Sequence, residues 1–396
     1  MTSAFPTPQD FSKILFDKMK HVNPAIADLE FYEFRYCLDN ITPRAGWTTV
    51  KPLPASEIDA MVSSRAFYNS IQVKPQVDGQ IVIDERIEQL AHRLFVGLVT
   101  DAYPLEWVNR LFYFDIRSFF FLHRTEYFSG PVLAHLGGKP YRQFEQKQKA
   151  FEYYQGVGYK DFSAANAEVD ASFIDSVKKI VASRGTPFLL AIAGQTAAGK
   201  TEIVERLKHT FEQEGRQTTS IELDNFLTDR DEREARGIFS QGKEAFHFEM
   251  FKKSLEDITH GKKISIPHYD TIVATSSHNK DGTLKPGRNP IVIEPADIIF
   301  IEGNFPFLIP EVVHLIGTKV VYLTDDHVRM KRKWKRDIDY RKKYDSTYFR
   351  NRYFKEQFIM AEVAYRPQME VCDMVVDTTG AALWVTPGFN RILDKN

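Results

Sequence analysis

The sequence GQTAAGKT, residues 194–201, has residue types and a spacing suited to binding a polyanion. Gly194 and Gly199 tolerate backbone conformations that other residues avoid, so the N–H groups between them can point inward toward phosphate oxygens. Lys200 and Thr201 complete the pattern G-x-x-x-x-G-K-[ST], in which the lysine reaches the β- and γ-phosphates and the threonine ligates Mg²⁺. The sequence predicts a nucleoside triphosphate site formed by Gly194, Gln195, Thr196, Ala197, Ala198, Gly199, Lys200 and Thr201.

The residues on either side of this loop agree with that interpretation. The apolar run PFLLAIA, residues 187–193, predicts a buried strand that ends at the loop, and TEIVERLKHTFEQE, residues 201–214, predicts an amphipathic helix. The start of a helix carries a partial positive charge that favours phosphate. The alternative is an ordinary strand, turn and helix with a fortuitous Gly-Lys-Thr, for which the chance in a chain of this length is about one in a hundred.

Two carboxylates stand at the ends of further apolar strands. The stretch TTSIELD ends at Asp224, and ADIIFIEG ends at Glu302 and Gly303. In a parallel sheet, ligands bind at the carboxyl ends of the strands, so we expect both acids beside the phosphate loop. Asp224 could accept a proton from a substrate hydroxyl or hold Mg²⁺ through water, and Glu302 could order Mg²⁺. The structural alternatives are a turn cap for Asp224 and a turn-forming or ion-paired carboxylate for Glu302.

The segment RMKRKWKRDIDYRKK, residues 329–343, is dense in positive charge and predicts a helix and its exit. Most such runs are solvated helix faces. Beside a phosphate site, however, a mobile basic lid could close over the polyphosphate, stabilise charge on the transferring group and exclude water. The crowding of like charges favours the lid, because a bound polyanion would relieve the repulsion.

A third group of polar residues lies in IPHYDTIVATSSH, residues 266–278. Tyr269, Asp270 and His278 offer hydrogen bonds and a stacking face to a small polar substrate, although Tyr and His are equally often structural. No set of histidines has the spacing of a zinc site, and no Ser-His-Asp arrangement stands out.

The alternation of strands and helices predicts the architecture that would position these residues. After about residue 161 the pattern is that of an α/β fold, a P-loop NTPase domain whose parallel sheet forms a three-layer structure with helices on both faces. Glycine and small polar residues between positions 154 and 173 predict a boundary. We therefore expect a mainly helical accessory domain of unknown role over residues 1–160 and the P-loop domain over residues 161–396.

Composition limits the classes of partner. The chain of 396 residues is 43% hydrophobic and 27% charged, with a formal net charge of −1, which gives no support for a nucleic-acid or anionic-membrane partner. Cys37 and Cys372 match no disulfide framework or zinc spacing, and the amino terminus lacks the pattern of a signal peptide. We expect a cytoplasmic protein with a small-molecule partner. The sequence leaves the formation of a homo-oligomer undecided, because aromatic residues occur in interfaces as readily as in cores.

Residues 187–377 resemble the superfamily of uridine kinases, phosphoribulokinases and type I pantothenate kinases. The resemblance rests on several elements in the same order: GQTAAGKT, ELDNF, EAFHFEMF, IPHYD, ADIIFIEGNF and KRDIDYR. It implies a phosphotransferase that moves the γ-phosphoryl group of ATP to a hydroxyl group with the help of Mg²⁺. It also implies that Asp224 is the catalytic base, that Glu302 helps to organise Mg²⁺, and that Arg336 and Arg341 of the lid contact the phosphates of ATP.

The resemblance leaves the acceptor open. Tyr269 and Asp270 match the element that lines the acceptor pocket of uridine kinases, and His278 matches the histidine of that pocket if the loop carries an insertion. The stretch DNFLTDRDEREARG, residues 224–237, looks more like that of pantothenate kinases, and Lys333 stands where a phosphate-binding arginine is frequent. We expect a uridine kinase-like enzyme. A pantothenate, sugar or sugar-phosphate kinase is one alternative, and a nucleotide-binding regulatory protein is another.

Overall fold

The computed structural model describes residues 5–27, 29–39, 41–62, 74–75, 81–82, 85–115, 119–122, 127–144, 166–238, 243–324, 329, 332–333, 336 and 360–394. The chain forms two compact units. The helical unit takes Met1–Glu126, Lys147–Tyr159 and Asp325–Glu362, and the sheet unit takes Tyr127–Gln146, Lys160–Thr324 and Val363–Asn396. The division into independently folding domains at residue 160 stays a prediction.

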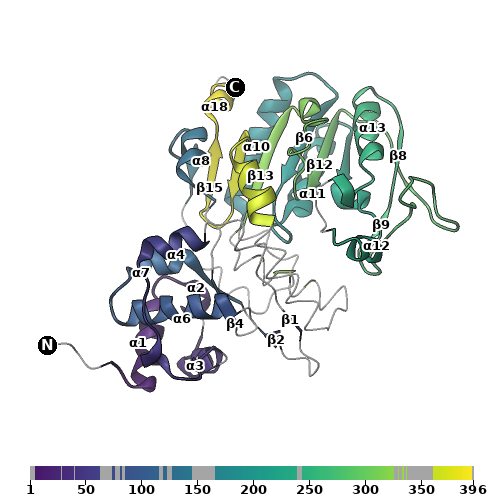
Figure 1. Cartoon of the computed structure of the whole chain (residues 1–396). Helices are drawn as coiled ribbons and strands as arrows, with labels where there is room; N and C mark the ends of the chain where they lie inside the picture. The colour runs from purple at the N-terminus through teal and green to yellow at the C-terminus, as the bar shows by residue number, and fades with distance from the viewer. Residues whose placement is uncertain are drawn as a thin grey trace. The chain divides into compact units, whose positions relative to one another are not determined.

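The sheet unit is organised by a seven-stranded sheet with the order β5-β15-β14-β13-β6-β12-β7 (Figure 1). Its five parallel strands are β6 (Phe188–Ala193), β7 (Thr218–Glu222), β12 (Ile298–Gly303), β13 (Thr318–Leu323) and β14 (Met374–Asp377). The sequence predicts all five: PFLLAIA, TTSIELD and ADIIFIEG for the first three, and the apolar runs TKVVYLT, residues 318–324, and CDMVVDT, residues 372–378, for β13 and β14. Strand β15 (Ala382–Val385) runs antiparallel to β14, and β5 (Arg142–Gln143) runs antiparallel to β15.

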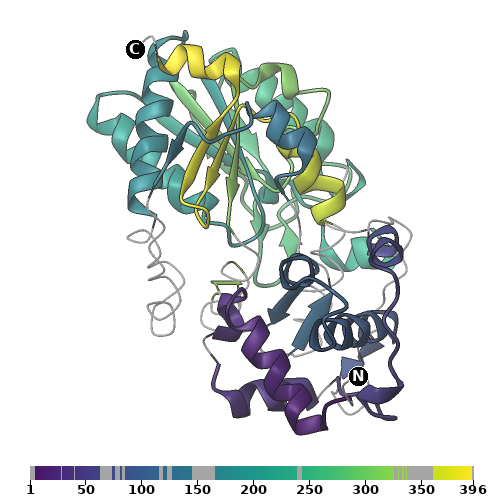
Figure 2. The same cartoon turned by 90° about the vertical axis from the view of Figure 1, so that its left-hand side faces the viewer.

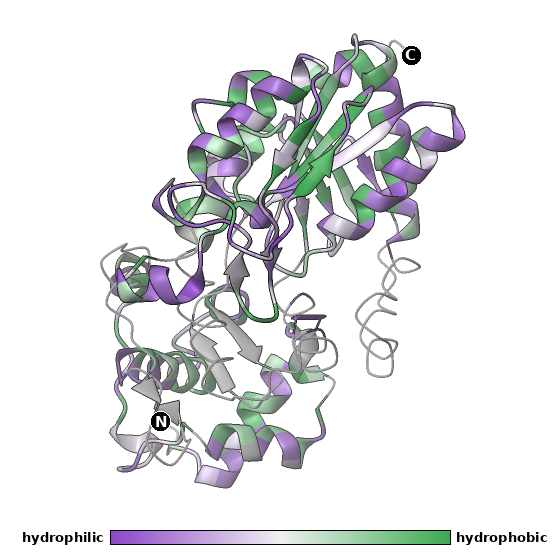
Figure 3. Ribbon diagram, turned by 90° about the vertical axis from the view of Figure 1, so that its right-hand side faces the viewer, coloured by the Kyte–Doolittle hydropathy of each residue, from purple (hydrophilic) through white to green (hydrophobic). Residues whose placement is uncertain are grey.

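Helices cover both faces of this sheet, as Figure 2 shows. On one face, helices α10 (Ala167–Ala182), α11 (Lys200–Gln213) and α18 (Pro387–Leu393) pack on the alternate apolar residues of the strands. The residues that point to the other face, such as Leu189, Ile299 and Ile301, are equally buried. Figure 3 shows this as apolar strands between helices with polar outer faces. The predicted α/β class with a parallel sheet is confirmed.

A small substructure extends the β7 edge of the sheet (Figure 1). Its elements are η2 (Leu223–Phe226), α12 (Arg230–Ala235), η3 (Lys243–Ala245), α13 (Phe248–Thr259), β8 (Ile264–Ile266), β9 (Tyr269–Asp270), β10 (Thr275–Ser276) and β11 (Ile291–Ile293). Strands β8 and β11 pair antiparallel, as do β9 and β10. The backbone N–H of Tyr269 donates to the side-chain oxygen of Asn225 at 3.2 Å, which fixes β9 against η2.

Residues 127–144 belong to the sheet unit, although they precede the predicted boundary. The sequence predicts a surface helix over residues 139–154, and this is wrong at its start: Arg142 and Gln143 form β5 and pair with β15. The outer edge of β15 offers unpaired backbone N–H and C=O groups, and β5 pairs with them. Residues 145–154 lie outside the described part of the chain. Just before β5, helix α8 (Gly130–His135) is fixed by a contact between His135 Nε2 and the carbonyl of Cys372 at 2.6 Å.

The helical unit confirms the prediction that the amino-terminal region is mainly helical. Its helices are α1 (Pro8–Met19), α2 (Pro24–Ala27), α3 (Phe31–Asp39), η1 (Trp47–Thr49), α4 (Ala55–Val62), α6 (Glu85–Val99) and α7 (Leu105–Leu111). The described residues of this unit also contain two short hairpins, β1 (Lys74–Pro75) with β2 (Ile81–Val82) and β3 (Phe112–Asp115) with β4 (Phe119–Leu122). In the core, Phe11 stacks on Trp47 with ring centroids 4.4 Å apart.

Among the described residues, none of the helices combines the length and the apolar character needed to cross a membrane.

A buried charge network joins helices α10 and α11 to the sheet. The carboxylate of Asp170 accepts hydrogen bonds from Arg206 Nη1 at 2.5 Å and from the hydroxyl of Tyr322 at 2.7 Å. The side chain of Asp170 is 4% exposed, so its charge depends on these donors for compensation.

We expect Asp170→Ala to destabilise the protein by about 2 to 3 kcal/mol, because the buried hydroxyl of Tyr322 and the charge of Arg206 lose their acceptor. Urea denaturation measures this. The matched control is Glu214→Ala, which breaks the exposed pair with Lys178 and should cost less than about 1 kcal/mol. Equal losses in the two variants would contradict a structural role for the network.

Candidate active site

The phosphate loop connects the end of β6 to the start of α11. Its backbone takes positive φ at Ala197 (65°) and Gly199 (107°), the conformation that turns successive N–H groups toward one side. A Cβ atom at Gly194 would lie 2.5 Å from the carbonyl oxygen of Tyr322, so this position requires glycine. The ammonium of Lys200 donates to the carbonyls of Gly194 at 2.8 Å and Gln195 at 3.0 Å, which places its charge over the loop.

Hydroxyl groups at the ends of two strands fix the middle of the loop. Thr324, which follows β13, donates to the carbonyl of Ala198 at 2.9 Å. The hydroxyl of Thr324 also lies 2.8 Å from that of Thr378, which follows β14. The loop is therefore attached to the two strands on one side of β6, in addition to its covalent links to β6 and α11.

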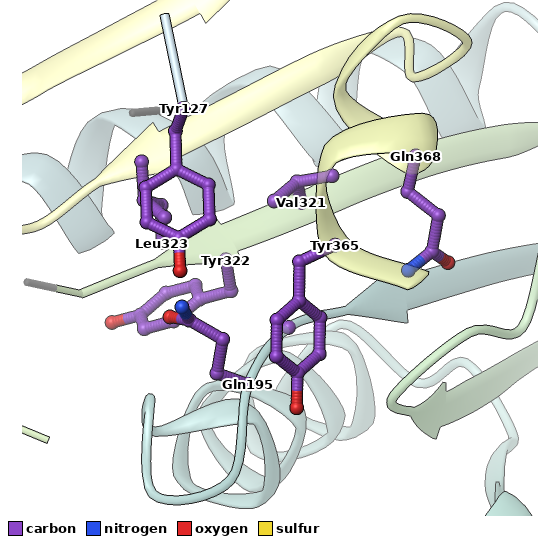
Figure 4. A pocket seen from close by; sticks show the side chains of 8 residues that line it. Tyr127, Gln195, Val321, Tyr322, Leu323, Tyr365 and Gln368 are labelled. Atoms are coloured by element: carbon purple, nitrogen blue, oxygen red, sulfur yellow. The ribbon is translucent and has the colours of Figure 1, made fainter. Parts of the chain in front are cut away.

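Aromatic residues pack against the first half of the loop, as Figure 4 shows. Tyr127, Tyr322 and Tyr365 surround the side chain of Gln195, and the space left among these side chains is about 10 Å³. This is room for about one water molecule, so it cannot admit a nucleotide base. The aromatic residues are a packed support for the loop rather than a binding pocket.

Glu302 is the central acid of the site. It is the penultimate residue of β12, is 5% exposed, and accepts a hydrogen bond from the hydroxyl of Thr201 at 2.9 Å. Burial raises its pKa from 4.5 to about 7; the charge of Lys200 opposes this rise and the charge of Glu222 adds to it. Glu302 is thus a buried acid positioned between a hydroxyl group and a lysine.

Glu222 is a residue of the site that the sequence analysis missed. It is the Cα partner of Glu302 in the parallel pairing of β7 with β12, so both carboxylates leave the sheet at the same level. Although Glu222 is an exposed residue, partial desolvation at the end of the strand and then the charge of Asp224 raise its pKa. The sequence TTSIELD could have indicated Glu222, because it is a second acid two residues before Asp224 at the end of the same predicted strand.

Asp224 lies in η2, directly after β7, and its side chain is exposed. Its negative charge contributes to the raised pKa values of both Glu302 and Glu222, so it lies within electrostatic reach of both. Lys200, Thr201, Glu302 and Asp224 are therefore brought to one edge of the sheet, where the strand order places β6, β12 and β7 side by side.

The donor set at this edge suits a hard divalent cation. Thr201 and Glu302 provide oxygen atoms, and a positive ion would compensate the buried carboxylate. The described residues contain no cluster of three or more Asp, Glu, His or Cys side chains with metal-binding geometry. Mg²⁺ fits such a site, because it is usually bound by one or two carboxylates together with substrate phosphates and water.

Tyr269, His278 and Asp270, which the sequence predicts to bind the phosphoryl acceptor, have different surroundings. The hydroxyl of Tyr269 is bonded to Arg233 Nη2 at 3.1 Å, and its ring is buried with Leu227 and Ala274. His278 is also buried, and its Nδ1 lies 2.9 Å from the hydroxyl of Ser277. Tyr269 and His278 thus help to form the framework of the β9–β10 hairpin.

Asp270 instead lines an open polar cavity of about 200 Å³. Its Oδ1 accepts from the backbone N–H groups of Ile272 at 2.8 Å and Val273 at 3.2 Å. These bonds, followed by the charges of His268 and Arg288, lower the pKa of Asp270. The cavity is lined by His268, Asp270, Thr275, Ser277, Gly287, Arg288 and Asn289.

The lid arginines have no established position at this site. Arg336 is helical and half-buried, and Arg341 lies outside the described residues. Both residues belong to the segment Asp325–Glu362, which is part of the helical unit. Their contact with phosphates stays a prediction.

Comparison with known proteins identifies the family of this site. The sequence model of the phosphoribulokinase / uridine kinase family matches residues 189–383. The uridine kinase of Brevibacillus brevis is 31% identical over 160 residues, which cover 40% of this chain and 69% of that protein. This chain belongs to the phosphoribulokinase / uridine kinase family. Uridine-cytidine kinase 2-B of Danio rerio is 28% identical over 165 residues, and these cover 39% of this chain and 59% of that protein.

Solved structures of this fold are more distant in sequence. D-glycerate 3-kinase from Cryptococcus neoformans is 11% identical, with a TM-score of 0.36 and coverage of 55% of this chain and 97% of that chain. A possible uridine kinase from Bacillus stearothermophilus is 20% identical, with a TM-score of 0.30 and coverage of 45% and 94%.

We expect Glu302→Gln to leave the stability of the nucleotide-free protein nearly unchanged at pH 4 and to raise it by about 1 to 3 kcal/mol at pH 8. The folded protein binds a proton at Glu302 up to a pH of about 7, whereas the ordinary pKa is 4.5. Wild-type stability therefore falls as pH rises between these values, while glutamine resembles the protonated form and does not titrate.

Urea denaturation at the two pH values measures this difference. The control is Glu294→Gln, which changes an exposed acid paired with Lys263 and should give the same small effect at both pH values. A Glu302→Gln effect that does not depend on pH would show that the raised pKa is wrong.

Proposed function

We propose that this protein is an ATP- and Mg²⁺-dependent kinase that transfers the γ-phosphoryl group to a hydroxyl group of a small molecule. The observation that carries the proposal is the convergence of Lys200, Thr201, Glu302 and Asp224 at the ends of adjacent strands. Membership of a family with uridine kinases among its members supports it, since those relatives are phosphotransferases with hydroxyl acceptors. The cytoplasm suits its two buried, unbridged cysteines.

The phosphate loop would bind and orient the triphosphate. Positive φ at Ala197 and Gly199 turns backbone donors inward, and glycine at position 194 allows close approach. Lys200 would move its hydrogen bonds from the carbonyls of the loop to the phosphates. Thr201 and Glu302 would hold Mg²⁺, which when bound supplies positive charge to the phosphate oxygens.

Asp224 would act on the acceptor. As the carboxylate that follows β7, it would orient the acceptor hydroxyl and accept its proton. Phosphoryl transfer is mostly positioning and electrostatics, so the acceptor must be held on the far side of the γ-phosphate, next to Asp224. Arg336 and Arg341 would close over the transferring group and exclude water.

A panel of acceptors tests the proposal. Mg²⁺-dependent ADP release from ATP would be measured with nucleosides, pantothenate, sugars, sugar phosphates and hydroxy acids. Acceptor-dependent release supports a kinase. ATP binding without acceptor-dependent release would overturn the proposal in favour of a nucleotide-binding regulatory protein.

We expect Lys200→Ala and Asp224→Asn each to lower turnover by at least about 100-fold, but for different reasons. Loss of the lysine removes charge from the phosphate site, so ATP binding should weaken strongly. Loss of the base should leave ATP binding nearly unchanged. Equilibrium binding of a fluorescent ATP analogue, measured beside turnover, separates the two, and full activity of Asp224→Asn would rule out its role as the base.

A further inference from the structure

We propose that the polar cavity beside η2 is the acceptor site and that it selects a small hydroxylated acid, with Arg288 binding the acid group and Asp270 a hydroxyl group. This inference rests on the proposed kinase function and names the substrate class of that site. The proposed acceptor is not a nucleoside, which is the acceptor first expected for a uridine kinase-like chain.

The cavity lies next to the candidate base. Strand β9, which carries Asp270, contacts η2, which carries Asp224, and the two are joined by the hydrogen bond from Tyr269 N–H to Asn225. On the same side, His268 lies within electrostatic reach of Glu222. A molecule in the cavity would therefore lie beside the acids at the end of β7.

The position of Arg288 is fixed by its own loop. The ammonium of Lys285 donates to both carboxylate oxygens of Asp229, at 2.8 and 2.6 Å, and to the carbonyl of Ser276 at 3.0 Å. The backbone N–H of Arg288 then donates to the carbonyl of Lys285 at 3.1 Å. These bonds attach the Arg288 loop to strand β10.

The lining of the cavity offers little of the apolar surface on which a nucleobase packs. Its described walls are a histidine, an aspartate, an arginine, an asparagine, two hydroxyl residues and a glycine, with no phenylalanine, tyrosine, tryptophan or aliphatic side chain. Tyr269, the residue before Asp270, is buried, and its hydroxyl is bonded to Arg233. The planar groups in this lining are the imidazole of His268 and the guanidinium of Arg288, and both are polar. The cavity of about 200 Å³ therefore offers polar contacts to a small polar molecule.

The charges of the cavity suit a molecule that carries both an acid and a hydroxyl group. Arg288 is an exposed residue whose guanidinium makes no hydrogen bond or ion pair with any other described residue, so its donors are available for a carboxylate or phosphate in the cavity that it lines. Asp270 uses Oδ1 for backbone N–H groups, which leaves Oδ2 to accept from a hydroxyl. The hydroxyl of Thr275 is buried without a hydrogen-bond partner in the described structure and would gain one from such a ligand.

The experiment compares neutral acceptors with their carboxylate and phosphate derivatives. The two series are glycerol, glycerate and glycerol 3-phosphate, and ribose, ribonate and ribose 5-phosphate, with uridine as the neutral nucleoside. ATP-dependent phosphorylation is measured with the full chain, and calorimetry measures binding of the same compounds to Asp224→Asn. The carboxylate and phosphate members of each series distinguish the two kinds of acid.

We expect phosphorylation of a carboxylate or a phosphate member, and not of its neutral counterpart or of uridine. Arg288→Ala should raise the KM for that acid about 10- to 100-fold and leave the KM for ATP unchanged, because a charge-assisted hydrogen bond is lost. Arg288→Lys should recover part of the loss. Lys280→Ala removes an exposed positive charge from the same loop, outside the cavity lining, and should change neither KM.

The outcomes separate this inference from the proposed function. Phosphorylation of uridine or of a neutral polyol with an unchanged KM in Arg288→Ala overturns the inference and leaves the kinase function standing. Arg288-dependent binding of an acid without phosphorylation of any acceptor would support acid binding by Arg288 in this cavity, but would overturn the kinase function and with it the role of the cavity as an acceptor site. Failure of every acid to bind in an Arg288-dependent manner overturns the inference.

Discussion

The burial of Glu302 at the end of the central strand β12 is the constraint on which the site depends. A carboxylate that is 5% exposed must be protonated, hydrogen-bonded or next to a positive charge. Thr201 and Lys200, which begin α11, provide the last two, and this fixes where the helix starts relative to the sheet. The apolar residues of β6 and β12, buried on both faces, leave no room for the strands to shift register. The chemistry therefore lies at an edge whose geometry is set by the core.

The phosphate loop depends on contacts from distant parts of the chain. Its carbonyl groups are held by Lys200 and by Thr324, and Thr324 in turn contacts Thr378 at the end of β14. The turn after β14 is itself held by β5, since Gln143 Nε2 donates to the carbonyl of Gly380 at 2.8 Å. Residues 127–144, which lie outside the segment that matches the family, therefore support the candidate phosphate loop of this chain.

The cavity proposed as the acceptor site is built differently. The hairpin β9–β10 uses the aromatic and histidine side chains for its own framework and presents small polar and charged residues to the cavity. The ion pair between Lys285 and Asp229 folds the following loop back, so Arg288 reaches a cavity that begins at His268. This loop is separate from the parallel sheet, so its residues can change without disturbing the strands that carry Glu302 and Asp224.

The sequence by itself determined the parallel strands, the phosphate loop and the strand-end acids Asp224 and Glu302, because periodicity and loop glycines are local signals. Only the tertiary structure decided that Glu222 faces Glu302, that Arg142 and Gln143 form an edge strand rather than a helix, and that Tyr269 and His278 are buried. Arg288 could not be connected with Asp270 from spacing alone. Cross-strand register, edge pairing and loop closure depend on contacts between residues far apart in the chain, and these leave no periodic pattern in the sequence.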